Sequence, residues 1–216
     1  DFEDGSHYIT LDSNVVNGIV TTATGLNLAV IHSASSTEND HITITNNEIN
    51  NGSYGMYLYG KSTSDVEEAC VISNNTIHDF HNYGIYIHLF DSLQLNSNEI
   101  YAKTTGGNSI QYGVYAHSCK NGSEFTKNRI RVNASSENYG FSLNACNGTS
   151  AEKNQVINNF ISCHNSSSIS YGIYSNSNSY NDFYHNSINV TDGSSSSGRA
   201  FCAISGSNIT LQNNIF

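Results

Sequence analysis

Phe125-Thr126-Lys127-Asn128-Arg129-Ile130 shows the pattern that decides the fold of this 216-residue chain. The asparagine lies three residues after one large apolar residue and two residues before another. The same pattern recurs every 23 to 33 residues, and all sixteen flanking positions are large and apolar. The chain is therefore a repeat array. Its repeats are centred on Asn14, Asn47, Asn75, Asn98, Asn128, Asn159, Asn186 and Asn214.

A second motif, Tyr-Gly-apolar-Tyr or a close variant, falls between successive asparagines. After each glycine, apolar and polar residues alternate, which is the period-two signature of a β-strand. Each repeat is thus expected to hold three short strands: one before the asparagine, one after it and one after the glycine. The copies are residues 54–57, 83–86, 112–115, 139–142 and 171–174, with weaker copies at Thr24-Gly25-Leu26-Asn27 and Arg199-Ala200-Phe201-Cys202.

The composition favours strands and turns over helices. Asn, Ser and Gly favour turns, whereas Ile, Val, Tyr and Phe favour strands. The absence of proline suits stacked strands, in which every backbone N–H is needed. We therefore predict an all-β, right-handed parallel β-helix of about seven rungs of roughly 28 residues, forming one domain over residues 1–216. Stacked rungs would place the asparagines in a buried ladder of hydrogen bonds, and asparagine also tolerates a left-handed turn conformation.

These motifs resemble the parallel β-helix repeat of the pectin-lyase-like superfamily, including its NosD-type repeats, over residues 9–216. The segments Asn181–Ile188 and Asn213–Phe216 are also similar to rungs of large secreted bacterial surface proteins. The resemblance implies a fold and leaves the activity open, because this fold carries many activities. It also implies an extracellular or cell-surface location.

Charge and termini restrict the possible partners. The formal net charge is −10 with only eight Lys and Arg residues, and no basic patch is evident in the sequence. Nucleic acid and anionic membranes are therefore poor partners. No apolar run is long enough to cross a membrane. Because the chain starts and stops within rungs and shows no leader, we expect a segment of a longer chain whose neighbouring domains are its partners.

The resemblance implies that a ligand would lie on the outer face of the sheet formed by the Tyr-Gly strands. Alternation places there a first column of Asn27, Tyr57, Tyr86, Tyr115, Ser142, Tyr174 and Cys202, and a second of Tyr59, His88, His117, Asn144 and Asn176. These residues could form a platform for polysaccharide or surface glycans. A cross-rung aromatic ladder that only stabilises the sheet is the favoured alternative. The platform residues are Tyr57, Tyr59, Tyr86, His88, Tyr115, His117 and Tyr174.

Neither outward column contains Asp, Glu, Lys or Arg. Glycoside hydrolases need paired carboxylates, and lyases need a positioned base, so we expect no catalytic residue, no enzyme activity and no cofactor. The leading hypothesis is a structural or adhesive segment of a large extracellular protein. The alternative is a fragment of a polysaccharide lyase or epimerase. Its candidate residues would be Lys61, Asp65, Glu67, Glu68 and Asp91.

Metal and disulfide sites have weak support. His78, Asp79, His81 and His88 lie within one rung, and by resemblance to NosD-type proteins they would suggest copper. His78 and His81 are expected in a loop and the spacing does not repeat, so no metal is predicted. Cys119 and Cys146 both follow their glycine by six residues and should stack within disulfide reach. Two reduced thiols that fill space are the alternative.

Overall fold

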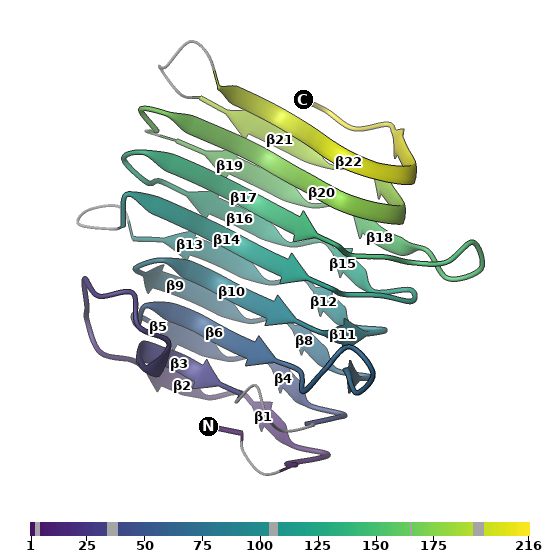
Figure 1. The fold of residues 1–216 in the computed structure, drawn as a ribbon. Coiled ribbons are helices and arrows are strands. Elements are labelled where there is room, and N and C mark those ends of the chain that lie inside the picture. Colours follow the sequence, from purple (N-terminus) through teal and green to yellow (C-terminus); the bar gives the residue numbers. More distant parts are fainter. Residues whose placement is uncertain (3–4, 34–38, 104–107, 165, 192–196) are drawn as a thin grey trace.

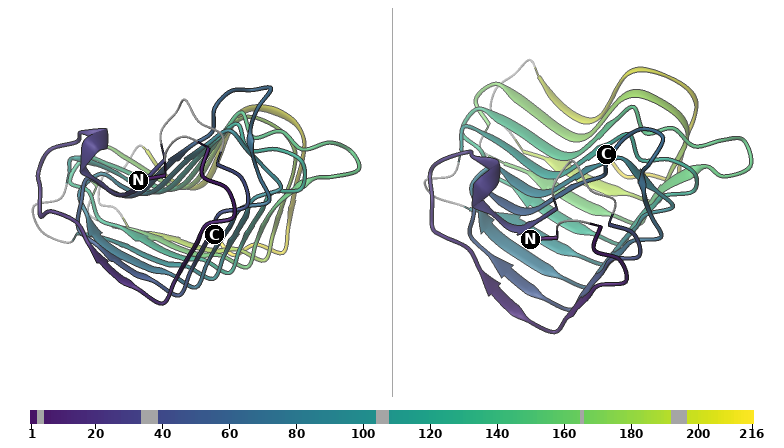
Figure 2. Two further views of the ribbon diagram at one scale, coloured as in Figure 1. Left: turned by 90° about the horizontal axis from the view of Figure 1, so that it is seen from below. Right: turned by 60° about the horizontal axis from the view of Figure 1, so that its bottom comes forward.

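The computed structural model describes residues 1–2, 5–33, 39–103, 108–164, 166–191 and 197–216. The chain winds into a right-handed parallel β-solenoid of about six turns, close to the seven rungs predicted (Figure 1). Each turn contributes three strands, and successive turns stack so that like strands pair in parallel. Figure 2 shows the same stack from below, where the strands of successive turns superpose into three walls. The predicted fold class is confirmed.

The first wall consists of strands that precede the ladder asparagines, and the second of strands that follow them. The first comprises β1 (Thr10–Asp12), β4 (Thr43–Thr45), β8 (Val71–Ser73), β12 (Gln94–Asn96), β15 (Glu124–Thr126) and β18 (Asn154–Ile157). The second comprises β2 (Val15–Asn17), β5 (Glu48–Asn50), β9 (Thr76–Phe80), β13 (Glu99–Ala102), β16 (Arg129–Val132), β19 (Phe160–Cys163) and β21 (Ser187–Val190).

The third wall carries the Tyr-Gly motifs. It comprises β3 (Ala29–His32), β6 (Tyr54–Tyr59), β10 (Tyr83–His88), β14 (Ile110–His117) and β17 (Glu137–Asn144). The longer strands β20 (Ile169–Tyr184) and β22 (Gly198–Gln212) begin in this wall and continue round into the first, which joins the two walls into one sheet. The short strands β7 (Glu67–Glu68) and β11 (Phe90–Asp91) pair separately.

Vertical registry follows the sequence repeat. Phe125 pairs with Leu95 below and Val156 above, and Ile130 pairs with Ile100 and Ile161 in the same way. These columns point inward and, with the apolar residues that follow the glycines, fill the interior. Fully buried members include Ile44, Leu95, Phe125, Val156, Ile49, Ile77, Ile100, Ile130, Ile161, Met56, Ile85, Val114, Phe141 and Ile173.

The predicted asparagine ladder runs unbroken from Asn14 to Asn214. In each link the backbone N–H and the side-chain amide of one asparagine donate to the Oδ1 of the next. The ladder asparagine was expected to adopt the left-handed turn conformation. The structure shows that conformation at the residue before it instead, such as Ser97 or Lys127, with φ of 57° at both. The ladder residue instead lies in the turn with its amide pointing inward.

The first copy of the Tyr-Gly motif was placed wrongly. Leu26–Leu28 forms a short 3-10 helix, η1, and the strand starts only at Ala29. Ala29 pairs with Tyr54 and His32 with Tyr57, so His32 replaces Asn27 in the first outward column. The β-branched pair Val30–Ile31 suits a strand and buries Ile31, which outweighs the glycine signal at Gly25.

No helix within the described ranges has the length and apolar character that a membrane span requires.

Candidate functional site

The structure places the predicted platform residues on the outer face of the third wall. Tyr57, Tyr86 and Tyr115 form one vertical row, and Tyr59, His88 and His117 form the row beside it. Tyr174 continues the first row, separated from Tyr115 by Ser142. The sequence therefore predicted the arrangement of this surface, while its role in ligand binding remains a hypothesis.

A third row of tyrosines lies on the same face and was not assigned to it from the sequence. It consists of Tyr54, Tyr83, Tyr112, Tyr139 and Tyr171. Strict alternation counted through the glycine would put Tyr54 inside with Met56. Tyr54 instead packs edge-to-face on Tyr57, with 5.5 Å between ring centroids, so both rings point outward although they are three residues apart.

The glycine between these tyrosines allows this shift in alternation because it faces inward. A Cβ on Gly113 would lie 2.2 Å from Ile130 Cγ2 and 2.6 Å from the carbonyl oxygen of Gly140 in the next turn. No other residue type fits at that distance from a neighbouring backbone. The motif is thus a packing requirement that also turns two successive tyrosine rows outward.

The tyrosine rings stack face to face on one another. Ring centroids along the new row are 4.8 Å apart for Tyr54–Tyr83, 4.6 Å for Tyr83–Tyr112 and 4.5 Å for Tyr112–Tyr139, all stacked nearly parallel. Tyr57 stacks on Tyr86 at 4.8 Å. The rings therefore present edges and hydroxyls outward, which is the geometry of the aromatic ladder favoured from sequence.

Burial changes the acidity of this surface. Desolvation raises the pKa of Tyr57 to about 12, helped by the nearby Tyr59 and Tyr54. Desolvation, with the charge of neighbouring His117, lowers the pKa of His88 to about 4. The pKa of His117 is also lowered by burial. At neutral pH the phenol and imidazole groups of this surface are therefore uncharged.

The histidines weighed as copper ligands, for which no metal was predicted, do not converge. His78 lies on β9 in the second wall, where it hydrogen-bonds Asp79 at 2.8 Å and Glu48 at 3.4 Å. His88 lies on β10 in the third wall, and His81 is buried in the turn between them. In the part of the chain that the structure describes, no three His, Cys, Asp or Glu side chains are grouped to hold a metal ion.

Cys119 and Cys146 stack as expected and are free thiols in the structure, as are the other three cysteines, so the disulfide between them stays a prediction. Both side chains are fully buried, and burial together with a hydrogen bond to Cys146 raises the pKa of the Cys119 thiol. Unreactive thiols that fill space are what this environment favours.

The carboxylates proposed for a polysaccharide enzyme are engaged in local contacts. Lys61 forms an ion pair with Asp65. Glu67 is buried on β7 and accepts a hydrogen bond from the backbone of Asn39. Asp91 pairs in register with Glu68. Its Oδ2 lies 3.8 Å from Lys120 Nζ and accepts a 2.6 Å hydrogen bond from the side-chain amide of Asn121.

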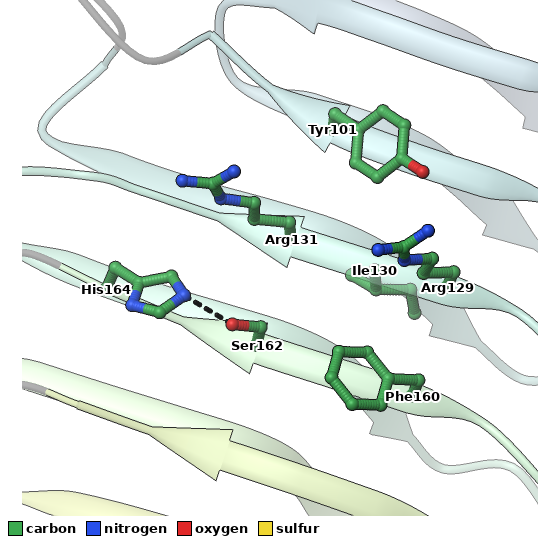
Figure 3. A pocket seen from close by; sticks show the side chains of 7 residues that line it. All are labelled: Tyr101, Arg129, Ile130, Arg131, Phe160, Ser162 and His164. Atoms are coloured by element: carbon green, nitrogen blue, oxygen red, sulfur yellow. Dashed lines mark hydrogen bonds between the residues drawn. The ribbon is translucent and has the colours of Figure 1, made fainter.

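A second surface, on the outer face of the second wall, was missed from the sequence. Its pocket of about 360 Å³ spans β13, β16 and β19 (Figure 3). The sequence showed no basic patch and did not single out Arg129 and Arg131, yet these two of the three arginines in the chain line one pocket. The available signal was Arg-Ile-Arg: alternation that buries Ile130 must turn both arginines outward. The pocket is lined by Tyr101, Arg129, Ile130, Arg131, Phe160, Ser162 and His164.

Comparison with known proteins gives few relatives. No protein-family model matches the chain, and no curated protein matches it either. Among solved structures, the chain is similar to the crystal structure of a double mutant of the periplasmic alginate epimerase AlgG, with a TM-score of 0.48 and 14% identity. The match covers 83% of this chain and 52% of that one, so the chain spans about half the length of that neighbour.

The architecture defines the class of protein: a right-handed parallel β-helix.

Proposed function

We propose that this chain is a rigid β-helix scaffold segment of an extracellular protein, with a structural or adhesive role. The observation that carries the proposal is the unbroken ladder from Asn14 to Asn214, which links every turn to the next by two hydrogen bonds. A solenoid whose turns each bond to their neighbours behaves as a continuous rod and can display ligand-contacting surfaces along its length.

The adhesive part of the proposal concerns the third-wall surface. Because the tyrosine rings stack on one another, a glycan would be recognised by hydroxyls and ring edges rather than by stacking on ring faces. These hydroxyls repeat at the rung spacing of about 4.8 Å. That spacing is comparable to the length of one sugar unit in an extended polysaccharide, so a chain laid along the rod could meet equivalent groups in each turn.

The test separates hydroxyls from rings. A Tyr86→Phe/Tyr115→Phe variant keeps the stacked ladder and removes two hydroxyls, whereas a Tyr86→Ala/Tyr115→Ala variant would also disturb the packing of the rings. On a glycan array the wild-type segment should bind extended polysaccharides, and the double Phe variant should bind them roughly tenfold more weakly. A Tyr8→Phe variant, altered at an exposed tyrosine away from this wall, is the matched control.

Two results would reject the adhesive role of this surface: no binding by the wild type, or equal binding by the double Phe variant. Chemical turnover of a polysaccharide by the purified segment would instead favour the alternative, a fragment of a lyase or epimerase, with Lys61, Asp65, Glu67, Glu68 and Asp91 as the residues to examine.

A further inference from the structure

The pocket on the second wall has features that the scaffold role does not require. Two register rows cross it. Tyr101, Arg131 and Ser162 lie one above another on β13, β16 and β19, and Glu99, Arg129 and Phe160 form the adjacent row. Figure 3 shows both guanidinium groups reaching from β16 over the outer surface, whereas Ile130 lies behind the ribbon.

Of the described residues, two arginines and no carboxylate line the pocket, in a chain of net charge −10. The nearest carboxylate to Arg129 is Glu99, with 3.8 Å between Nη1 and Oε1, and both side chains are about half exposed. Such a contact constrains a guanidinium only weakly. Within the described ranges no ion pair involves Arg131. Both arginines can therefore offer their forked N–H donors to an anion, and this geometry matches a carboxylate or sulfate.

The aromatic rings here are arranged unlike those of the third wall. Phe160 is 49% exposed, and the hydroxyl group of Tyr101 donates a hydrogen bond to Glu99 Oε2 at 2.6 Å. No aromatic ring among the described residues stacks on either one, and in Figure 3 both present their flat faces to the viewer. Open aromatic faces suit the apolar C–H face of a sugar ring, which the stacked tyrosine ladder cannot receive.

The third component is a fixed set of polar groups. His164 hydrogen-bonds through its Nε2 to the hydroxyl of Ser162 and through its Nδ1 to Thr191 Oγ1 at 2.5 Å. Both ring nitrogens are thus engaged, which holds the imidazole against the pocket rim. The hydroxyl of Ser162, held in place by His164, can then orient a hydroxyl group of a ligand at the side opposite Tyr101.

From these contacts we propose that the pocket binds an anionic sugar unit: a single sugar ring that carries a carboxylate or a sulfate. The anionic group lies between the guanidinium groups of Arg129 and Arg131, and the apolar face of the ring packs on Phe160. A volume of about 360 Å³ accommodates one such ring with part of a neighbour. The site is separate from the tyrosine surface and does not depend on its function.

The experiment titrates the full chain by isothermal calorimetry with three probes that share a neutral core: sialyllactose, sulfated lactose and lactose. We expect saturable binding of one or both anionic probes and none of lactose. Preference between the two anionic probes identifies carboxylate or sulfate. Arg131→Gln and Phe160→Ser should each weaken binding by about tenfold or more, since each removes one of the two recognition elements. Both positions are solvent-facing, so the fold should persist.

Arg199→Gln is the matched control, because it removes the same charge from the only arginine outside the pocket. Arg199 lies on β22 and contacts Tyr171 in the third wall. The Arg199→Gln variant should bind the anionic probes as tightly as the wild type does. Equal binding of lactose, no binding of either anionic probe, or an equal loss with Arg199→Gln would overturn the proposal. The Tyr86→Phe/Tyr115→Phe variant should retain sialyllactose or sulfated lactose binding, which keeps a failure of this proposal distinguishable from a failure of the tyrosine surface.

Discussion

Asn98 illustrates what one side chain does in the ladder. Its Oδ1 accepts from the backbone N–H and the amide of Asn75, both at 3.0 Å. Its amide donates to the carbonyl of Ile72 at 2.9 Å and to Asn128 Oδ1 at 3.1 Å. Only a planar amide offers an acceptor and two donors from so short a side chain. The side chain is fully buried, so each of these groups would otherwise lack a partner away from water.

The Asn98→Ala variant should therefore be strongly destabilised. It leaves buried donors on Asn75 and a buried carbonyl on Ile72 without their partners, which we expect to lower the free energy of unfolding by roughly 2–5 kcal/mol. Asn14→Ala, at an exposed ladder position, is the control and should cost less than about 1 kcal/mol. Urea denaturation followed by circular dichroism measures both. Equal losses in the two variants would contradict the role of burial.

At the scale of elements, the third wall is stabilised from both sides. Its inner face buries the residues that follow the glycines, and its outer face carries three rows of side chains that contact their neighbours above, below and across. Tyr86 alone contacts Tyr57, Tyr115, Tyr54 and Tyr83 at centroid distances of 4.8, 5.0, 6.2 and 5.6 Å. The outer rows therefore contribute to stability as well as to the surface.

We expect Tyr86→Ala to lower the free energy of unfolding by about 1–3 kcal/mol, because four ring contacts are lost. Tyr86→Phe keeps the ring and should change it by less than about 0.5 kcal/mol. Guanidinium denaturation of the two variants makes the comparison. If Phe were as costly as Ala, the hydroxyl rather than the ring stack would carry the stabilisation.

At the scale of the whole molecule, the stack depends on many buried neutral groups, so its stability should vary with pH at both extremes. His88 has a pKa of about 4 in the fold against 6.5 as an unperturbed group. As the pH falls, His88 takes up a proton in the unfolded chain before it does so in the folded chain. The contribution of neutral His88 to the free energy of unfolding is therefore complete above about pH 6.5 and is lost as the pH falls toward 4. Its packed neighbours are Tyr59 and His117.

At alkaline pH, stability is lost as the pH rises rather than as it falls. Tyr57 has a pKa of about 12 in the fold against 10.0 as an unperturbed group. Its stabilisation is complete below pH 10 and is lost as the pH rises through 12, because the unfolded phenol ionises first. The buried thiols Cys70 and Cys119, whose pKa values are raised from an ordinary 9.0, lose stabilisation in the same direction from about pH 9. The midpoint of urea denaturation should therefore be flat from about pH 7 to 8 and fall on either side. His88→Gln should flatten the acid arm only. An unchanged acid arm in that variant would show that another group is responsible.

The repeat alone predicted the β-helix, the ladder and the inward columns, because these depend on spacing that recurs in every turn. Residues such as Asn98, Leu95 and Ile100 are specified by their distance from one another along the chain, and registry then stacks them. The platform rows of Tyr57 and His88 followed from the same alternation. Where the spacing was irregular, as between Gly25 and Ala29, the assignment from sequence shifted by five residues.

Only the tertiary structure decided which outward residues meet across turns and how their rings lie. Tyr54 joined the outer face because the glycine after it breaks strict alternation, a consequence of packing against the next turn. Arg131 meets Tyr101 and Ser162, each about thirty residues away, because three turns stack in register. The sequence determines the period of the winding, while the chemistry of a surface depends on lateral contacts between turns, since neighbours there are separated by a full repeat along the chain.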